Sequence, residues 1–196
     1  LEFRRVLFRS REPPFFFMKT LEAILPVEVG IETPLPYPSG TSDYHHEVEL
    51  VVALGRGGRD IAEADAMDHV FGFAVGLDMT RRDLQGEAKK LGRPWEIGKS
   101  ADASGPVGPI SRIGAPEFSL AGSIRLTTDG VEKQNSVLAA MIWSIPEQIA
   151  ILSRYFELRA GDLIFTGTPE GVSAVDRGQV MVGSIDGLES IRLKVV

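Results

Sequence analysis

Residues 45–54 read His-His-Glu-Val-Glu-Leu-Val-Val-Ala-Leu, and this Val- and Leu-rich run is typical of a buried β-strand. Side chains two positions apart on a strand point to the same face, so Glu47 and Glu49 would project side by side. Two buried carboxylates repel each other, and a hard divalent cation such as Mg²⁺ or Ca²⁺ would relieve that repulsion. The alternative is a half-buried strand whose acidic pair faces solvent.

The composition indicates one domain with a sizeable core, because the 196 residues are 43% hydrophobic. The net charge of −6 offers no basic surface, so nucleic acid is not an expected partner. A membrane is not expected either, since no apolar run approaches the roughly 18–20 residues that span a bilayer. Cysteine is absent, which excludes disulfides and thiolate metal sites and fits a cytoplasmic protein.

The first ten residues differ in character from the rest of the chain. Residues 1–10 carry three arginines without a clear period, and we interpret them as a non-native segment joined to the chain. A genuine basic β-strand is the alternative. Residues 11–196 are expected to form a single domain.

Strand patterns outnumber helix patterns along the rest of the chain. Three consecutive phenylalanines at residues 15–17 predict a strand buried on both faces. Ser144-Ile145-Pro146-Glu147 is a capping-box pattern and predicts the start of a helix. Further strands are predicted at residues 70–79, 119–127, 162–166 and 191–196, and a second helix within residues 80–91. This balance favours a β-rich α+β domain.

A second group of polar residues follows the strand predicted at residues 70–79. Asp78 ends that strand and could cap the next helix, whereas Arg82 and Gln85 would share one face of it. A guanidinium beside an amide suits a substrate carboxylate, although a solvated helix surface gives the same pattern.

Two further features fit an anion-binding pocket. Lys99 lies between small residues and could stabilise a developing oxyanion. Residues 167–172, Gly-Thr-Pro-Glu-Gly-Val, form a tight loop whose N–H groups and Thr168 hydroxyl could hold an anionic oxygen. A surface lysine and a simple Pro/Gly turn are the alternatives.

Taken together, six motifs occur in the order found in the fumarylacetoacetate hydrolase family, which the chain strongly resembles. They are Phe-Phe-Phe-Met-Lys, His-His-Glu-Val-Glu-Leu, Gly-Leu-Asp-Met-Thr-Arg-Arg-Asp-Leu-Gln, Gly-Lys-Ser, Met-Ile-Trp-Ser-Ile-Pro-Glu and Phe-Thr-Gly-Thr-Pro-Glu-Gly-Val. The resemblance covers residues 11–196 and looks closest to the bacterial branch that cleaves fumarylpyruvate. It implies the family's mixed β-sandwich roll, usually a homodimer.

The resemblance also implies roles for individual residues. Glu47, Glu49 and Asp78 match three carboxylate ligands for Mg²⁺ or Mn²⁺. Four positions near the substrate carry over as well: Arg82 and Gln85 beside its carboxylate, Thr168 in the anion-holding loop, and Lys19 after the aromatic run. Lys99 matches the active-site lysine.

The family places a strand and a lid helix before the aromatic run, with the pattern Asn-Tyr-x-x-His-x-x-x-Glu. Its histidine activates the attacking water. Residues 1–10 do not match this pattern, so we expect the chain to lack that general base. His46 is a poor substitute, because it would point to the face opposite Glu47.

The implied activity is metal-dependent hydrolysis of a carbon–carbon bond in a β-diketo acid. The substrate would be fumarylpyruvate, cleaved to fumarate and pyruvate in aromatic-acid (gentisate) catabolism. Two alternatives stay open: an oxaloacetate decarboxylase or 2-hydroxymuconate-type isomerase of the same superfamily, and an inactive metal-binding fragment.

Overall fold

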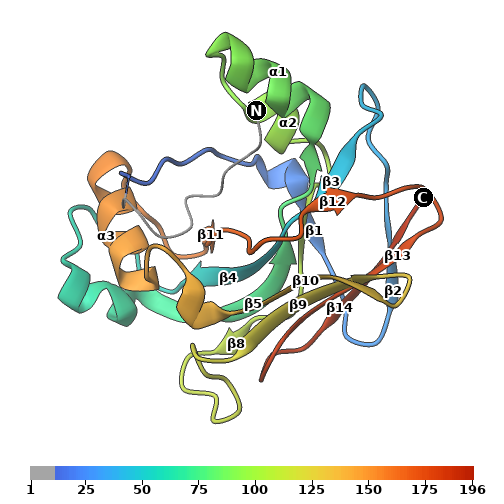
Figure 1. Cartoon of the computed structure of the whole chain (residues 1–196). Coiled ribbons are helices and arrows are strands. Elements are labelled where there is room, and N and C mark those ends of the chain that lie inside the picture. The colour runs from blue at the N-terminus through green and yellow to red at the C-terminus, as the bar shows by residue number, and fades with distance from the viewer. Residues whose placement is uncertain (1–11) are drawn as a thin grey trace.

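The computed structural model describes residues 12–196, and its core is two β-sheets packed face to face (Figure 1). A six-stranded sheet has the order β1-β7-β5-β4-β11, with β8 also paired to β5, and a five-stranded sheet has the order β10-β9-β13-β14-β2. A small third sheet has the order β12-β3-β6. The strands of the first sheet are β1 (Ile24–Pro26), β4 (Val48–Leu54), β5 (Val70–Leu77), β7 (Gly105–Val107), β8 (Ser111–Arg112) and β11 (Leu163–Phe165).

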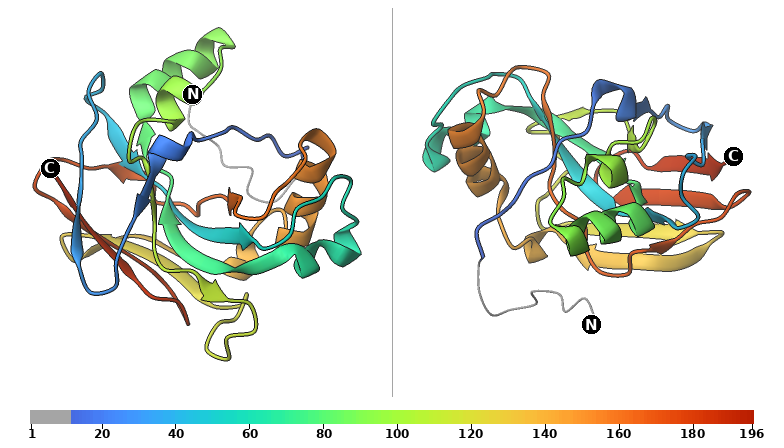
Figure 2. Two further views of the ribbon diagram at one scale, coloured as in Figure 1. Left: turned by 180° about the vertical axis from the view of Figure 1, so that it is seen from behind. Right: turned by 90° about the horizontal axis from the view of Figure 1, so that it is seen from above.

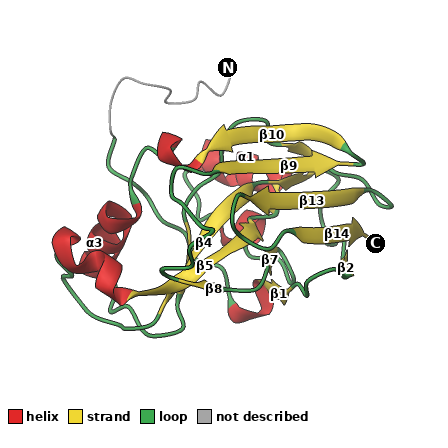
Figure 3. Ribbon diagram, turned by 90° about the horizontal axis from the view of Figure 1, so that it is seen from below, coloured by secondary structure: helices red, strands yellow, loops and turns green. Residues whose placement is uncertain are grey.

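The second sheet forms one layer of long neighbouring strands, as Figure 3 shows for β9, β10, β13 and β14. Its strands are β2 (Glu32–Leu35), β9 (Ser123–Thr128), β10 (Val131–Val137), β13 (Val180–Ile185) and β14 (Ile191–Val195), and the third sheet contains β3 (Tyr44–His46), β6 (Thr80–Arg81) and β12 (Ser173–Ala174). Most pairs are antiparallel, but β1–β7 and β14–β2 are parallel, so both large sheets are mixed. The expected β-rich α+β fold with a mixed β-sandwich is therefore confirmed.

The helices lie outside the sheets. Figure 2 shows α3 (Ile145–Tyr155, orange) apart from α1 (Arg82–Leu91) and α2 (Glu96–Lys99), both green. The 3₁₀ helices are η1 (Leu21–Ala23), η2 (Glu63–His69) and η3 (Leu138–Ala140). The predicted capping box is confirmed, because Ser144 and Glu147 bond each other's backbone N–H groups at the start of α3. No helix among residues 12–196 is long and apolar enough to cross a membrane.

Alternate side chains of β4 pack into the main core between the sheets. Val48, Leu50, Val52 and Leu54 belong to that cluster, whereas Val51 belongs to a smaller one on the other face with Ala74 and Val107. The sheets approach closely at Gly183 on β13, where an added Cβ would lie 3.3 Å from the Val75 side chain and 3.5 Å from that of Val48.

Most sequence-based elements are present, with shifted ends. The helix predicted within residues 80–91 starts at Arg82, because Thr80 and Arg81 pair with β3 as strand β6. It ends at Gly92, which has a positive φ of 64°. The hairpin turn between β9 and β10 places Asp129 and Gly130 at φ 49° and 76°, as two-residue hairpins require.

The strand predicted at residues 15–17 is wrong. This segment is extended but pairs with no strand, and the Phe15 side chain is 70% exposed. Phe15 instead packs edge-on against Trp95, with ring centroids 5.1 Å apart. An aromatic run signals apolar contact, but a strand also needs a free sheet edge at the right place. Residues 1–10, which we expect to be a non-native segment, lie outside the described residues.

Candidate metal centre

Glu47, Glu49 and Asp78 converge because β4 and β5 pair antiparallel. Val48 at the start of β4 pairs with Leu77 at the end of β5, and the Asp78 N–H donates to the Glu47 carbonyl at 2.9 Å. One ligand atom from each of the three carboxylates lies within 4.8 Å of the others. Their residues are only 7%, 4% and 2% exposed, so the solvent-facing alternative for the acidic pair is excluded.

The alternation of the strand also explains the direction of these carboxylates. Val48 and Leu50 point into the main core, so Glu49 between them points to the opposite face of the sheet. Glu47 lies in the single-residue break between β3 and β4. The site is therefore on the face of β4 that the main core does not use.

Lys99 provides the most buried positive charge of the site. Its Nζ donates to Asp78 Oδ2 at 2.6 Å, Glu47 Oε2 at 3.0 Å and Thr80 Oγ1 at 2.8 Å, and the Phe17 ring centroid lies 4.9 Å away. Burial lowers the pKa of Lys99, but Asp78 and Glu47 outweigh burial, so the pKa is raised. Lys99 is thus held as a cation between two carboxylates.

Lys19 contacts the Asp78 oxygen that Lys99 leaves free. Its Nζ lies 2.9 Å from Asp78 Oδ1, although not in hydrogen-bond geometry. The ammonium also donates to the backbone carbonyls of Met79, Lys99 and Ser104 and to the Ser104 hydroxyl. Burial lowers the pKa of Lys19, partly offset by Asp78. Lys19 therefore holds the turn that carries Lys99.

Arg82 and Gln85 lie together on α1, as the i, i+3 spacing predicts. One Arg82 Nη donates to Glu47 Oε1 and the other to Gln85 Oε1. Asp78 does not cap this helix, because α1 begins after Arg81 and the Asp78 carboxylate faces the two lysines.

Glu49 is the carboxylate that the positive charges compensate least. Burial raises its pKa well above the usual value, and the charges of Asp78 and Glu47 raise it further. The Gly167 N–H donates to Glu49 Oε2 at 2.7 Å and opposes that rise. A divalent cation fits this donor set, because it would offset the repulsion among three buried carboxylates with the oxygen ligands that Mg²⁺ and Mn²⁺ accept.

The loop at residues 167–171 lies beside the carboxylates, but its groups have partners within the chain. The Thr168 hydroxyl donates to the Val48 carbonyl at 2.9 Å and accepts from Gln134 Nε2 at 2.8 Å. The Gly167 N–H does hold an anionic oxygen, and here that oxygen belongs to Glu49. Neither Gln134 nor Thr80 was predicted as a site residue. Gln134 stands in none of the six motifs, and Thr80, although it lies between Asp78 and Arg82 in one of them, carries no charge that would single it out.

Each of the three histidines of the chain has its own protein partner. His46 lies opposite Glu47 as expected and contacts Gln134 and Ser173, and burial lowers its pKa to about 4. His45 Nε2 lies 2.7 Å from Asp43 Oδ1, and His69 contacts Arg56.

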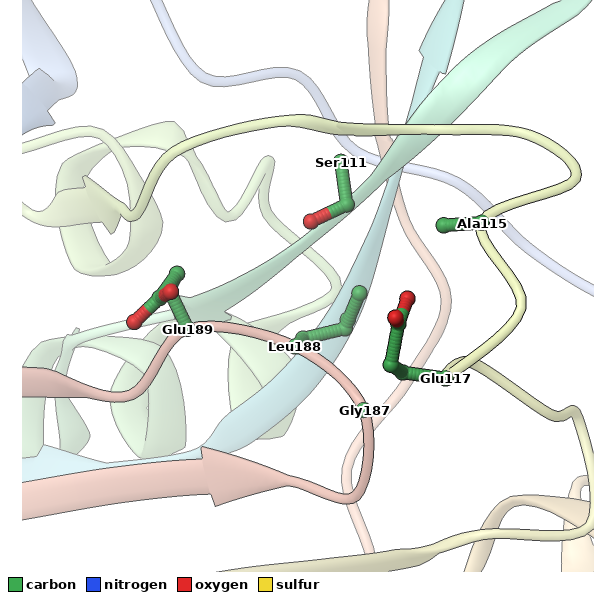
Figure 4. A pocket seen from close by; sticks show the side chains of 6 residues that line it. All are labelled: Ser111, Ala115, Glu117, Gly187, Leu188 and Glu189. Atoms are coloured by element: carbon green, nitrogen blue, oxygen red, sulfur yellow. The ribbon is translucent and has the colours of Figure 1, made fainter.

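A separate hollow of about 350 Å³ lies between the segment that follows β8 and the turn before β14. Figure 4 shows Glu117 and Glu189 on either side of Leu188 in this hollow. It shares no residue with the metal centre.

Comparisons with known proteins show which family and which relatives the chain resembles. The family described as Fumarylacetoacetate (FAA) hydrolase C-terminal matches residues 4–196. A fumarylpyruvate hydrolase of Ralstonia sp is 41% identical, over 95% of this chain and 95% of that protein. The mitochondrial oxaloacetate tautomerase of Rattus norvegicus is 42% identical, over 93% of this chain and 80% of the rat protein.

A solved structure extends the likeness to the whole fold. The crystal structure of fumarylpyruvate hydrolase from Pseudomonas aeruginosa, in complex with Mn²⁺ and pyruvate, matches with a TM-score of 0.91 and 53% identity. The match covers 95% of this chain and 80% of that one. The chain therefore belongs to the fumarylacetoacetate hydrolase family.

Proposed function

We propose that this chain hydrolyses a carbon–carbon bond of a β-diketo acid, with fumarylpyruvate as the substrate and fumarate and pyruvate as the products. The observation that carries this proposal is the buried triad Glu47, Glu49 and Asp78, whose ligand atoms lie within 4.8 Å of one another. The likeness to fumarylpyruvate hydrolases, one of them solved with Mn²⁺ and pyruvate, supports the same reaction class.

In this proposal Glu47, Glu49 and Asp78 hold Mg²⁺ or Mn²⁺. Once bound, the ion would supply Lewis acidity toward the 2-oxo acid end of the substrate. Arg82, beside Gln85 and Glu47, orients the substrate carboxylate through its planar guanidinium.

Lys99 acts on charge that develops during the reaction. Its ammonium lies against Glu47 and Asp78, and its raised pKa keeps it positive at neutral pH. Attack of water on the distal carbonyl puts negative charge on that oxygen, which a fixed cation stabilises.

The attacking water also needs a proton acceptor, which typically contributes about 10²–10⁴-fold in rate. His46 is buried between Gln134 and Ser173 and does not face the carboxylates. His46 is therefore not the proton acceptor that this mechanism needs.

The test is pyruvate release from fumarylpyruvate, followed through NADH oxidation by lactate dehydrogenase. We expect no release above background in EDTA and restored release when excess Mn²⁺ is added. Turnover that is equal with and without EDTA would contradict the metal-dependent mechanism. Pyruvate release without fumarate would contradict the assigned bond cleavage.

A second candidate is chemistry on oxaloacetate, which the 42% identity to the rat tautomerase favours. The same carboxylates and Lys99 would serve a reaction that needs no attacking water. Oxaloacetate should be assayed in parallel for keto–enol exchange and for loss of CO₂. Turnover of oxaloacetate without any cleavage of fumarylpyruvate would replace hydrolysis with this candidate.

A further inference from the structure

Gln134 is buried on a strand whose other side chains are mostly exposed. β10 lies at the edge of the five-stranded sheet, and Gln134 is 1% exposed. The register shifts between Glu132 and Gln134, which pair with Thr127 and Leu126, so Lys133 is the extra residue of a β-bulge. Bulges redirect a side chain next to a functional site, and this one lies where Gln134 turns toward the metal centre.

Both ends of the Gln134 amide are fully used. Its Oε1 accepts from the Val48 N–H at 3.0 Å and lies 2.9 Å from His46 Nδ1. Its Nε2 donates to Thr168 Oγ1 at 2.8 Å and to the Pro169 carbonyl at 2.9 Å. A primary amide offers two acceptor sites and two donors, and all four have partners here.

The groups bonded to Gln134 Oε1 belong to the residues on either side of Glu47. His46 and Val48 are the two neighbours of Glu47 in the break between β3 and β4. An amide oxygen only accepts, so His46 carries its hydrogen on Nδ1, and its Nε2 accepts from the Ser173 hydroxyl at 2.9 Å. The backbone of Glu47 is thereby held on both sides.

The groups that accept from Gln134 Nε2 belong to the loop that contacts a second carboxylate, that of Glu49. Thr168 and Pro169 follow Gly167, whose N–H donates to Glu49. The same loop is pressed against the bulge at its far end, where a Cβ on Gly171 would lie 1.9 Å from the Lys133 carbonyl oxygen. The loop can therefore approach the bulge this closely only because residue 171 is a glycine.

We propose that Gln134 is a positioning residue of the metal centre, which fixes Glu47 through its oxygen and the Gly167–Glu49 contact through its nitrogen. This inference rests on the proposed function in one respect, namely that these carboxylates hold a divalent cation. Gln134 itself touches neither carboxylate nor any reacting atom.

The test measures Mn²⁺ affinity by titration calorimetry, without substrate, for the wild-type chain and two variants. Gln134→Met keeps the length of the side chain and removes all four hydrogen bonds, whereas Gln134→Asn keeps an amide that is one methylene too short. We expect Mn²⁺ to bind about 10- to 100-fold more weakly in both, as for other residues that orient metal ligands.

The matched control is Asn135→Met, because Asn135 is exposed on the same strand and its amide donates to Glu132, away from the metal centre. It should bind Mn²⁺ as the wild type does. Circular dichroism at the titration temperature checks that each variant is folded.

The outcomes distinguish failure of this inference from failure of the proposed function. Wild-type affinity in either folded Gln134 variant would overturn the positioning role and leave the metal centre intact. Failure of both variants to fold at any temperature would overturn it too, since Gln134 would then be a folding residue. A wild-type chain that binds no Mn²⁺ would overturn the metal centre and this inference together.

Discussion

The two faces of β4 have opposite requirements. On one face Val48, Leu50 and Val52 pack into the core between the sheets, where apolar side chains of suitable size are sufficient. On the other face Glu49, with Glu47 beside it, needs charged and polar partners from several separate segments. One face thus stabilises the fold, while the other gathers buried carboxylates that repel one another, and substitutions on the two faces should give opposite results.

Glu49→Gln should have the largest effect on the site and little on the fold. We expect it to weaken Mn²⁺ binding by more than about 100-fold, because changes outside the ligand set already cost that much. The glutamine oxygen can still accept from the Gly167 N–H, and the buried charge that repels Asp78 and Glu47 is removed. In EDTA the melting temperature should therefore be unchanged or higher.

Differential scanning fluorimetry with and without Mn²⁺ checks both parts. The wild type should melt at a higher temperature with Mn²⁺, because an ion that binds only the folded state stabilises it. Glu49→Gln should lose that shift, and Glu63→Gln, an exposed acid in η2, should keep it. An undiminished shift in Glu49→Gln would remove Glu49 from the ligand set.

Lys99→Met should have the second-largest effect on the site. It removes the buried cation and keeps a similar length of side chain. We expect kcat to fall about 10²–10³-fold, as when one donor to an oxyanion is removed. Mn²⁺ affinity should not fall, because Lys99 shares Glu47 and Asp78 with the proposed ion. Steady-state kinetics in excess Mn²⁺ measure the effect, with exposed Lys90→Met as the control. A kcat within tenfold of the wild type would contradict the role assigned to Lys99.

Leu50→Ala probes the core face of the same strand. Leu50 is fully buried, so truncation should lower the free energy of unfolding by about 2–5 kcal/mol. Urea unfolding in EDTA measures this, and Leu91→Ala, half exposed at the end of α1, should change it by less than about 0.5 kcal/mol. Where Leu50→Ala is folded, its Mn²⁺ affinity should match that of the wild type. A parallel loss of affinity would show that the two faces are not independent.

This contrast also explains what the sequence could predict. Core faces follow a local period, so β4 and β5 were predicted close to their observed ends, and the capping box placed the start of α3. The pair Glu47 and Glu49 was predicted from its spacing within one apolar run, whereas Asp78 joined the ligand set only through the family resemblance. Their grouping then needed only the antiparallel pairing of β4 with β5.

The features that the sequence did not predict depend on contacts between segments that are far apart in the chain. Gln134 lies 86 positions from Val48, and only a β-bulge and a folded loop bring its amide to the site. Of the aromatic run at residues 15–17, Phe17 is partly buried against Lys99 and Phe15 is exposed, so the predicted burial on both faces is wrong. No local pattern states whether a sheet edge is free to receive that segment. The homodimer, the preference for Mg²⁺ and the cytoplasmic location stay predictions from the sequence.

Ser144→Ala should have the smallest effect and serves to calibrate the others. The Ser144 hydroxyl accepts from the Glu147 N–H at 3.4 Å, and its loss should cost about 0.5–2 kcal/mol of unfolding free energy. Ser144→Asp, which keeps an acceptor at the cap, should recover most of that loss. Neither change touches β4 or the metal centre, so Mn²⁺ affinity and kcat should equal those of the wild type. If Ser144→Ala weakened Mn²⁺ binding, a general loss of stability would be enough to disturb the carboxylates. The expected independence of the two faces of β4 would then fail, however well Glu49→Gln and Leu50→Ala behaved.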